Sequence, residues 1–112
     1  VIGGLLKKYG LHAVMTKDGV EALQHLTAHH QDFDLVFMDC EMPNMDGYAA
    51  TTRLRQWEAT EGVSPIFICG VSAHVIKEFK DRALQAGMDD FIVKPLHRAD
   101  LLRILQDVAG RH

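Results

Sequence analysis

Short hydrophobic runs alternate along the chain with stretches in which hydrophobic residues recur every three or four positions. Apolar runs of roughly four to eight residues are typical of strands covered on both faces, and the longer spacing is typical of helices with one buried side. Regular alternation of the two patterns indicates strands joined by crossover helices. The sequence therefore predicts an α/β protein with a parallel sheet, built from four strands and five helices.

The predicted strands are His12–Thr16, Asp34–Met38, Ile66–Val71 and Phe91–Val93. The predicted helices are one over 1–9 that Gly10 stops, one that Asp18 caps and that ends at His29 and His30, Tyr48–Glu58, one through Val75, Phe79 and Ala83 that Gly87 stops, and one with the stripe Leu101, Ile104, Leu105 and Val108. Residues 60–64, which include a threonine, a glycine and a serine, are expected to form a polar connection.

The composition is that of a folded protein, because 47% of its residues are hydrophobic and 24% are charged. With 112 residues there is room for one domain, 1–112. A net charge of -3 without a basic stripe predicts no direct binding of nucleic acid. No apolar stretch reaches the roughly 20 residues that cross a bilayer, so no membrane contact is expected of this segment.

The two cysteines and seven histidines predict neither a disulfide framework nor a metal site. Cys40 and Cys69 are too few for a disulfide framework and are expected to be free thiols in a reducing cytoplasm. Cys40 could be a redox thiol, but a packing role is favoured. His29 and His30 are expected to lie on the solvated surface, since the histidines lack the spacing of metal ligands.

Three polar residues each follow a predicted strand. Asp39, Ser72 and Lys94 come directly after hydrophobic runs. Because the carboxyl ends of parallel strands lie at one edge of the sheet, a carboxylate, a hydroxyl and an ammonium should meet there. The trio suits phosphoryl transfer to Asp39, with Lys94 offsetting charge and Ser72 donating a hydrogen bond. A hard cation such as Mg²⁺ would also be needed, and Asp39 alone cannot hold it well.

Three ordered motifs carry a resemblance to a known family. They are Asp39-Cys40-Glu41-Met42-Pro43-Asn44-Met45-Asp46-Gly47, Val71-Ser72-Ala73 and Phe91-Ile92-Val93-Lys94-Pro95. In order and spacing they resemble the response-regulator receiver domains of two-component signalling. The resemblance implies a flavodoxin-like, doubly wound parallel sheet with strand order 2-1-3-4-5.

The same resemblance implies a role for each matching residue. Asp39 resembles the phosphoacceptor, Ser72 the hydroxyl position and Lys94 the charged partner. Phe91 resembles the aromatic switch residue, although a simple core role is open as well. Glu41 would lend its backbone carbonyl to Mg²⁺, and Glu41 and His74 resemble positions that line the path of the hydrolysing water, so they are expected to set the phosphoryl lifetime.

The implied partner is a histidine kinase or a histidine phosphotransfer domain, from whose phosphohistidine Asp39 would take the phosphoryl group; a homodimer is a further option. The long polar stretch from Arg53 to Pro65 resembles receivers attached to hybrid histidine kinases. The segment itself is expected to be cytoplasmic and not an enzyme, with a parent protein that could be anchored in the inner membrane.

The chain departs from the family at its start, because the first strand and its acidic pair are not in the sequence and Val1 resembles a position inside the first helix. We expect an N-terminally truncated receiver whose remaining acidic Mg²⁺ ligands lie upstream of Val1. The strand His12–Thr16 should then have no neighbour to pair with. Without those ligands, Mg²⁺ binding should be poor.

Two alternatives stay open at this point. A haloacid-dehalogenase-like phosphatase also uses a strand-end aspartate, a later hydroxyl and a lysine, but it needs a second aspartate where this chain has Glu41. A pseudo-receiver would bind partners without being phosphorylated. Asp39 could also be an ordinary loop carboxylate, although its company with Ser72 and Lys94 favours the functional reading.

Overall fold

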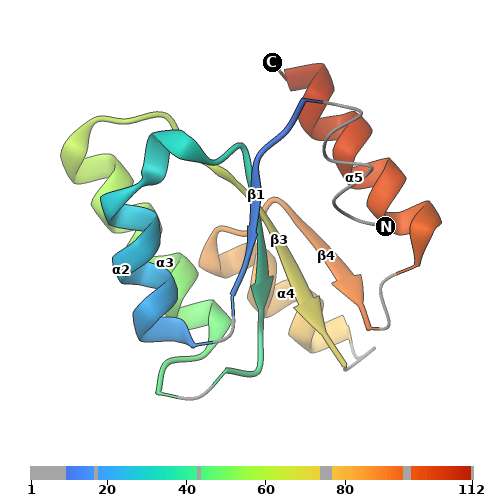
Figure 1. The fold of residues 1–112 in the computed structure, drawn as a ribbon. Coiled ribbons are helices and arrows are strands. Elements are labelled where there is room, and N and C mark those ends of the chain that lie inside the picture. Colours follow the sequence, from blue (N-terminus) through green and yellow to red (C-terminus); the bar gives the residue numbers. More distant parts are fainter. Residues whose placement is uncertain (1–9, 17, 43, 74–76, 95–96, 112) are drawn as a thin grey trace.

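The computed structural model describes residues 10–16, 18–42, 44–73, 77–94 and 97–111 (Figure 1). Its elements are β1 (Ala13–Met15), α2 (Gly19–Ala28), the 3₁₀ turn η1 (His30–Asp32), β2 (Leu35–Asp39), α3 (Gly47–Glu61), β3 (Phe67–Ser72), α4 (Lys77–Ala86), β4 (Asp90–Val93) and α5 (Arg98–Arg111). The helix predicted over 1–9 lies outside the described residues, as do His74 and Val75.

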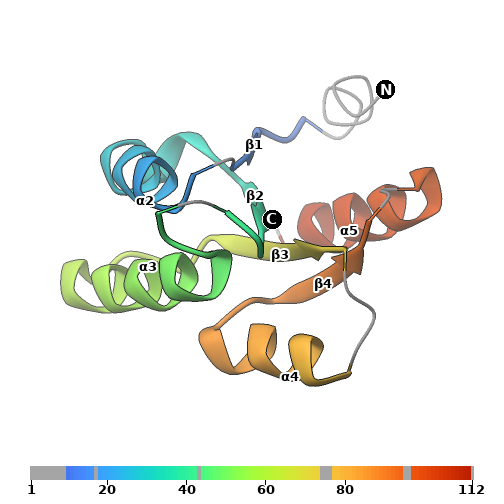
Figure 2. The same cartoon turned by 90° about the horizontal axis from the view of Figure 1, so that it is seen from below.

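The four strands form one parallel sheet in the order β1-β2-β3-β4. All strands point the same way, so their carboxyl ends share one edge (Figure 1). Among the described elements, α5 covers one face of the sheet, while α2, α3 and α4 lie on the other (Figure 2). This arrangement confirms the predicted α/β class.

The pleat of β2 shows how the sequence fills both layers. Leu35 and Phe37 face the α5 side, whereas Val36 and Met38 face the α3 side, and none of the four is more than 1% exposed. A strand buried on both faces needs an uninterrupted apolar run, because alternate side chains enter opposite cores. At about 25 cal/mol per Å² of buried apolar surface, these two cores are the main source of stability.

The expectation that the strand near Ala13 lacks a neighbour is wrong. β1 pairs in parallel with β2 over Ala13↔Leu35, Val14↔Val36 and Met15↔Phe37. Backbone donors and acceptors along the edge of β2 would destabilise the fold if they were buried without partners. Among the described strands, β1 supplies those partners.

The helix ends differ by a few residues from those expected, and local chemistry explains why. Asp18 caps α2 as predicted, accepting hydrogen bonds from Val20 N at 2.9 Å and Glu21 N at 3.2 Å. The helix ends at Ala28, before the predicted His29 and His30. Helix α3 continues to Glu61, into the predicted polar connection, and ends at Gly62, whose φ of 69° suits glycine.

His30 is not on the solvated surface, which corrects the expectation from the sequence. Its side chain is 9% exposed, and Nε2 lies 2.6 Å from Oε2 of Glu58, whose side chain is 3% exposed. Glu58 also accepts from Ile66 N at 2.8 Å and from Arg55 Nη1 at 2.8 Å. Arg55 donates further to Gly87 O at 2.8 Å, so this group ties the beginnings of β2, β3 and β4 to α3.

None of the helices in the described ranges is long and apolar enough to cross a membrane.

Candidate functional site

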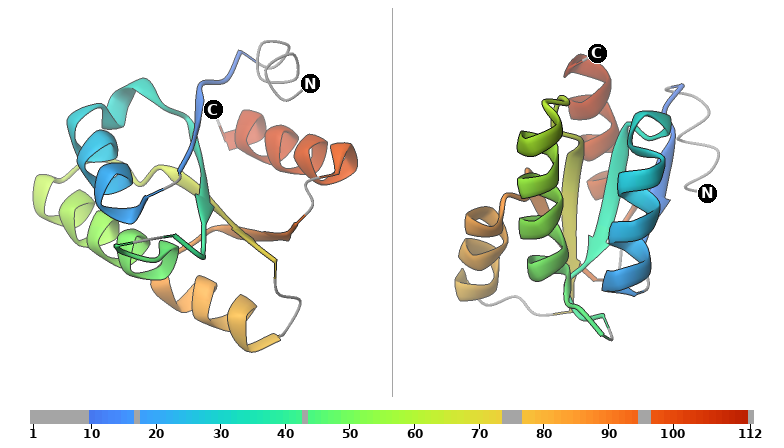
Figure 3. Two further views of the ribbon diagram at one scale, coloured as in Figure 1. Left: turned by 60° about the horizontal axis from the view of Figure 1, so that its bottom comes forward. Right: turned by 90° about the vertical axis from the view of Figure 1, so that its left-hand side faces the viewer.

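The strand register brings the three predicted polar residues to one level. Asp39 is paired with Val71, and Ser72 is paired with Val93. The backbone N–H of Lys94 donates to the carbonyl oxygen of Ser72 at 2.7 Å, which continues the ladder by one residue. Asp39, Ser72 and Lys94 therefore stand at the carboxyl ends of three adjacent strands, the edge that Figure 3 (left) turns forward.

Asp39 and Lys94 form an ion pair at this edge. Lys94 Nζ donates to Asp39 Oδ2 at 2.9 Å, and the two side chains are 41% and 27% exposed. The hydrogen bond to Asp39 raises the pKa of Lys94, against a smaller effect of burial. The ammonium group thus stays charged, and the carboxylate remains reachable from solvent.

Ser72 is fully buried, and its hydroxyl is bound by a residue from the neighbouring loop. Ser72 Oγ donates to Glu41 Oε1 at 3.1 Å, and the backbone N–H of Ala73 donates to the same oxygen at 3.1 Å. The backbone N–H of Glu41 in turn donates to Asp39 Oδ1 at 3.0 Å. Glu41 therefore connects the end of β2 to the end of β3.

The loop after β2 is held close to the site by Gly47. Gly47 N donates to Cys40 O at 3.2 Å, and a Cβ at position 47 would stand 2.3 Å from the carbonyl oxygen of Asp39. Only a residue without a side chain allows so close an approach. Gly47 is also the first residue of α3, so the helix begins next to the backbone of Asp39.

Helix α4 contacts the end of this loop and the start of α3 through Arg82. The guanidinium carbon of Arg82 lies 4.4 Å from the ring centroid of Tyr48, and Arg82 Nη2 lies 3.7 Å from Asp46 Oδ2. Asp46 caps α3 by accepting from Ala49 N at 2.8 Å. A charged group of α4 is therefore in contact with the start of α3, next to the site.

Phe91 lies further back along β4, paired with Gly70. Its ring is partly buried and packs against the hydrophobic cluster that contains Ile68, Ala83 and Met88. The contact that the described residues give this side chain is therefore one of apolar packing.

Asp39 and the Glu41 backbone offer oxygen atoms, the donors that a hard cation such as Mg²⁺ prefers. Across the described part of the chain, no group of three or more His, Cys, Asp or Glu side chains is arranged to hold a metal ion. Asp39 thus fits such a cation as one ligand of a larger set.

One contact of the site was not predicted from the sequence. Glu41 was expected to contribute a backbone carbonyl, whereas its carboxylate holds Ser72 and Ala73. A signal was available, because a glutamate two residues beyond a strand end is long enough to reach the next strand. The sequence alone gives no direction for that side chain.

Comparisons with known proteins show the family of the chain. The family model of the response regulator receiver domain matches residues 1–106. The sensor histidine kinase GacS of Pseudomonas protegens is 35% identical over 110 residues, which are 98% of this chain and 12% of that protein. The sensor histidine kinase RcsC of Escherichia coli is 40% identical over 91 residues, 81% of this chain and 9% of that protein.

Among solved structures, the chain resembles the receiver domain of a sensor histidine kinase from Pseudomonas aeruginosa PAO1, which was solved with a magnesium ion in its active site cleft. The TM-score is 0.73 with 35% identity, covering 97% of this chain and 85% of that one. The chain belongs to the response regulator receiver domain family. It matches about an eighth or less of the two curated kinases.

Membership of this family confirms the flavodoxin-like fold class, and it favours a phosphoacceptor receiver over both the phosphatase and the pseudo-receiver.

Proposed function

We propose that Asp39 is the residue that this receiver domain uses to accept a phosphoryl group from a phosphohistidine. The observation that carries the proposal is the pairing of Asp39 with Lys94 at 2.9 Å, at the strand end shared with Ser72. A strand-end carboxylate beside a fixed ammonium is both reachable and placed next to charge compensation. The matching family model supports the assignment.

In the proposed reaction, a carboxylate oxygen of Asp39 attacks phosphorus. The P–N bond of the phosphohistidine breaks as the new P–O bond forms, and the imidazole leaves with its electron pair. Lys94 offsets negative charge on the phosphoryl oxygens, and Ser72 donates a hydrogen bond to one of them. The result is an acyl phosphate on Asp39.

Mg²⁺ is the proposed cofactor, as in the Pseudomonas aeruginosa receiver. Asp39 and the backbone carbonyl of Glu41 would be ligands, together with acidic residues upstream of Val1 in the parent protein. A bound cation would reduce the repulsion between the carboxylate and the incoming phosphoryl group. With Asp39 and the Glu41 carbonyl as its only protein ligands, Mg²⁺ would bind weakly.

Phe91 is the proposed aromatic switch residue. It lies on β4, three residues before Lys94, and packs on the face of the sheet that α4 covers. Because phenylalanine carries no polar atom, it can change its burial without leaving a hydrogen bond unsatisfied. We further propose that Glu41 and His74 set the lifetime of the acyl phosphate; His74 lies outside the described residues.

The parent protein is proposed to be a hybrid histidine kinase, as GacS and RcsC are sensor histidine kinases. The proposed phosphodonor is a histidine kinase or a histidine phosphotransfer domain, with a homodimer as an additional assembly. On this proposal residues 1–112 form one receiver domain that works in the cytoplasm and is not itself an enzyme. Membrane anchoring would belong to the parent.

The test is phosphorylation of the parent protein with radiolabelled ATP. The wild type should acquire a label that hydroxylamine removes, as expected of an acyl phosphate, and Asp39→Asn should abolish that hydroxylamine-sensitive label. Asp81→Asn, an exposed carboxylate on α4, is the matched control and should leave it unchanged. A hydroxylamine-sensitive label that persists in Asp39→Asn would place the phosphoacceptor elsewhere.

A further inference from the structure

One oxygen atom of Glu41 accepts both hydrogen bonds that the end of β3 offers. Ser72 Oγ and the backbone N–H of Ala73 each lie 3.1 Å from Oε1. The Glu41 residue is otherwise exposed, while Ser72 is fully buried. An exposed side chain thus folds back to satisfy a buried hydroxyl.

Two donors that converge on one anionic oxygen form the arrangement that stabilises an oxyanion. Ser72 cannot turn to bulk solvent for a substitute, because its residue is 0% exposed, and a buried hydroxyl without a partner is unfavourable. The buried hydroxyl of Ser72 therefore needs an acceptor from the protein, and the Glu41 carboxylate supplies one.

The backbone of Glu41 is held in place as well. Its backbone N–H donates to Asp39 Oδ1 at 3.0 Å, while Lys94 holds Oδ2 at 2.9 Å. The carboxylate of Glu41 is thus anchored next to the proposed phosphoacceptor and occupies the donors at the end of β3. A phosphoryl group on Asp39 would carry two negative charges toward the same donors, and two anions cannot share them without strong repulsion.

We propose that the Glu41 carboxylate is an internal competitor of the phosphoryl group. In the unphosphorylated domain it holds Ser72 and Ala73, and on phosphorylation a phosphoryl oxygen displaces it from both donors. This inference rests on the proposed function of Asp39. It makes Glu41 a positioning residue that sets how readily the site accepts a phosphoryl group and that holds the end of β3 in its unphosphorylated place.

The competition can be measured with beryllofluoride and Mg²⁺, a non-covalent stand-in for the phosphoryl group, titrated calorimetrically into the parent protein. Glu41→Ala should bind beryllofluoride about tenfold more tightly than the wild type, the equivalent of one net hydrogen bond released from competition. Glu41→Asp keeps the charge but shortens the reach, so it should also bind more tightly. A pure charge effect predicts that Glu41→Asp behaves as the wild type.

A double-mutant cycle provides the second control. If Glu41 competes through the donors of β3, replacing it in a Ser72→Ala background should give a clearly smaller gain than in the wild type, because one of the two contested donors is already gone. Equal gains in both backgrounds, or no gain in Glu41→Ala and Glu41→Asp, would overturn the inference. Thermal unfolding of each variant confirms that the domain is folded.

The outcomes for the two proposals are separable. Wild-type protein that binds beryllofluoride with the same affinity as both Glu41 variants defeats the competitor role and leaves Asp39 as the phosphoacceptor. Wild-type protein and variants that all fail to bind, together with no Asp39-dependent label from ATP, defeat the proposed function and this inference with it.

Discussion

The ammonium nitrogen of Lys94 lies 2.9 Å from Oδ2 of Asp39, although 55 positions separate the two residues in the chain. Neither residue could reach the other without two crossover connections that return the chain to the same edge of the sheet. The contact is therefore a direct product of the parallel topology, in which every strand ends where the site begins.

Loss of the Lys94 ammonium should impair phosphoryl acceptance far more than stability. Lys94→Gln removes a charge that would face the phosphoryl oxygens, and loss of such a group lowers rates by about 10²–10³. Because the ion pair is partly exposed, the free energy of unfolding should change by less than about 1 kcal/mol. Labelling kinetics and urea unfolding measure the two effects.

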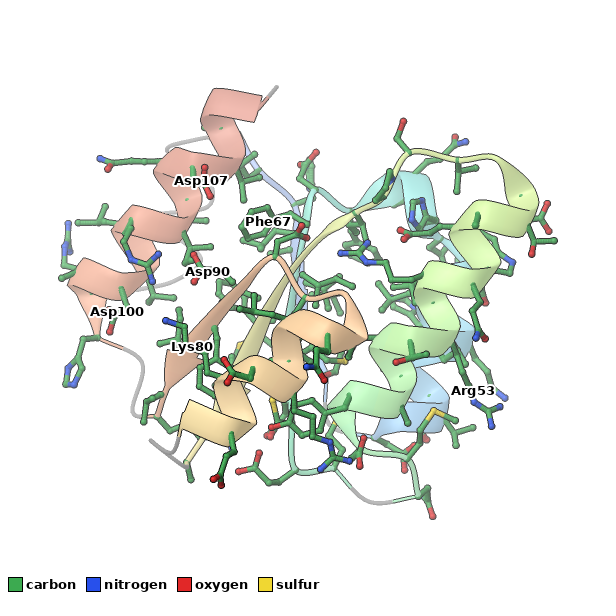
Figure 4. The ribbon with its side chains drawn as sticks, turned by 180° about the vertical axis from the view of Figure 1, so that it is seen from behind. Arg53, Phe67, Lys80, Asp90, Asp100 and Asp107 are labelled. Atoms are coloured by element: carbon green, nitrogen blue, oxygen red, sulfur yellow. The ribbon has the colours of Figure 1, made fainter. Side chains whose placement is uncertain are left out.

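Lys80→Gln is the matched control for that variant. Lys80 is an exposed lysine on α4, which Figure 4 places on the outer surface of the domain. Its replacement should leave both measurements at wild-type values. Equal loss of labelling in the two lysine variants would contradict a local role for Lys94.

A side chain at position 47 should disturb the loop next to Asp39. In Gly47→Ala the new Cβ would start 2.3 Å from the carbonyl oxygen of Asp39, so the backbone must move, at a cost of about 1–3 kcal/mol in unfolding free energy. Gly110→Ala is the control, since nothing lies within 4 Å of a Cβ there and alanine favours a helix. Chemical denaturation should destabilise the first variant and not the second.

The buried carboxylate of Glu58 should be among the most sensitive positions of the fold. Glu58→Ala leaves the Ile66 N–H without its acceptor and removes one of the acceptors of Arg55, which keeps Gly87 O and Asp89. A buried donor left without a partner costs about 1–3 kcal/mol. Glu61→Ala, an exposed position on the same helix, should cost no more than about 0.5 kcal/mol. Similar melting temperatures for both variants would contradict the role of the network.

Acid should weaken the start of α2. The Glu21 N–H, the Asn44 amide and the Val20 N–H donate to Asp18, and these bonds lower its pKa below the ordinary value of 3.8. A depressed pKa means that the carboxylate stabilises the fold above about pH 4 and loses this contribution as the pH falls through the lower, folded value. Asp18→Asn keeps a capping oxygen without titrating.

The measurement for Asp18 is the midpoint of urea unfolding between pH 2 and pH 6. The wild type should lose more stability than Asp18→Asn over the acid part of this range. Parallel curves for the two proteins would show that the cap does not contribute to acid unfolding.

Both thiols should be unreactive in the folded protein. Burial raises the pKa of Cys40 to about 11, and burial also raises the pKa of Cys69. At pH 8 each thiol is then protonated as well as inaccessible, at 1% and 0% exposure. A thiol reagent should label neither until the protein is unfolded in guanidinium chloride; rapid labelling of native Cys40 would contradict this.

The sequence predicted much of the framework, because each strand and helix leaves a local mark. The buried strand before Asp39 reads as an apolar run, and Asp18 reads as a helix cap whatever the rest of the chain does. Helix ends were less certain, since α3 continues to Glu61 until Gly62 allows a left-handed turn. Polar residues near a helix end do not by themselves end it.

The alternating elements, and the three polar residues at the carboxyl ends of β2, β3 and β4, could be read from the sequence, since hydrophobic period and strand ends are local properties. The partners of long side chains and of strand edges became known from the folded structure. Glu41 meets Ser72 across 31 positions, His30 meets Glu58 across 28, and β1 takes the edge of β2. Those choices depend on which buried donors and acceptors remain unsatisfied after folding, and that is a property of the whole packed chain.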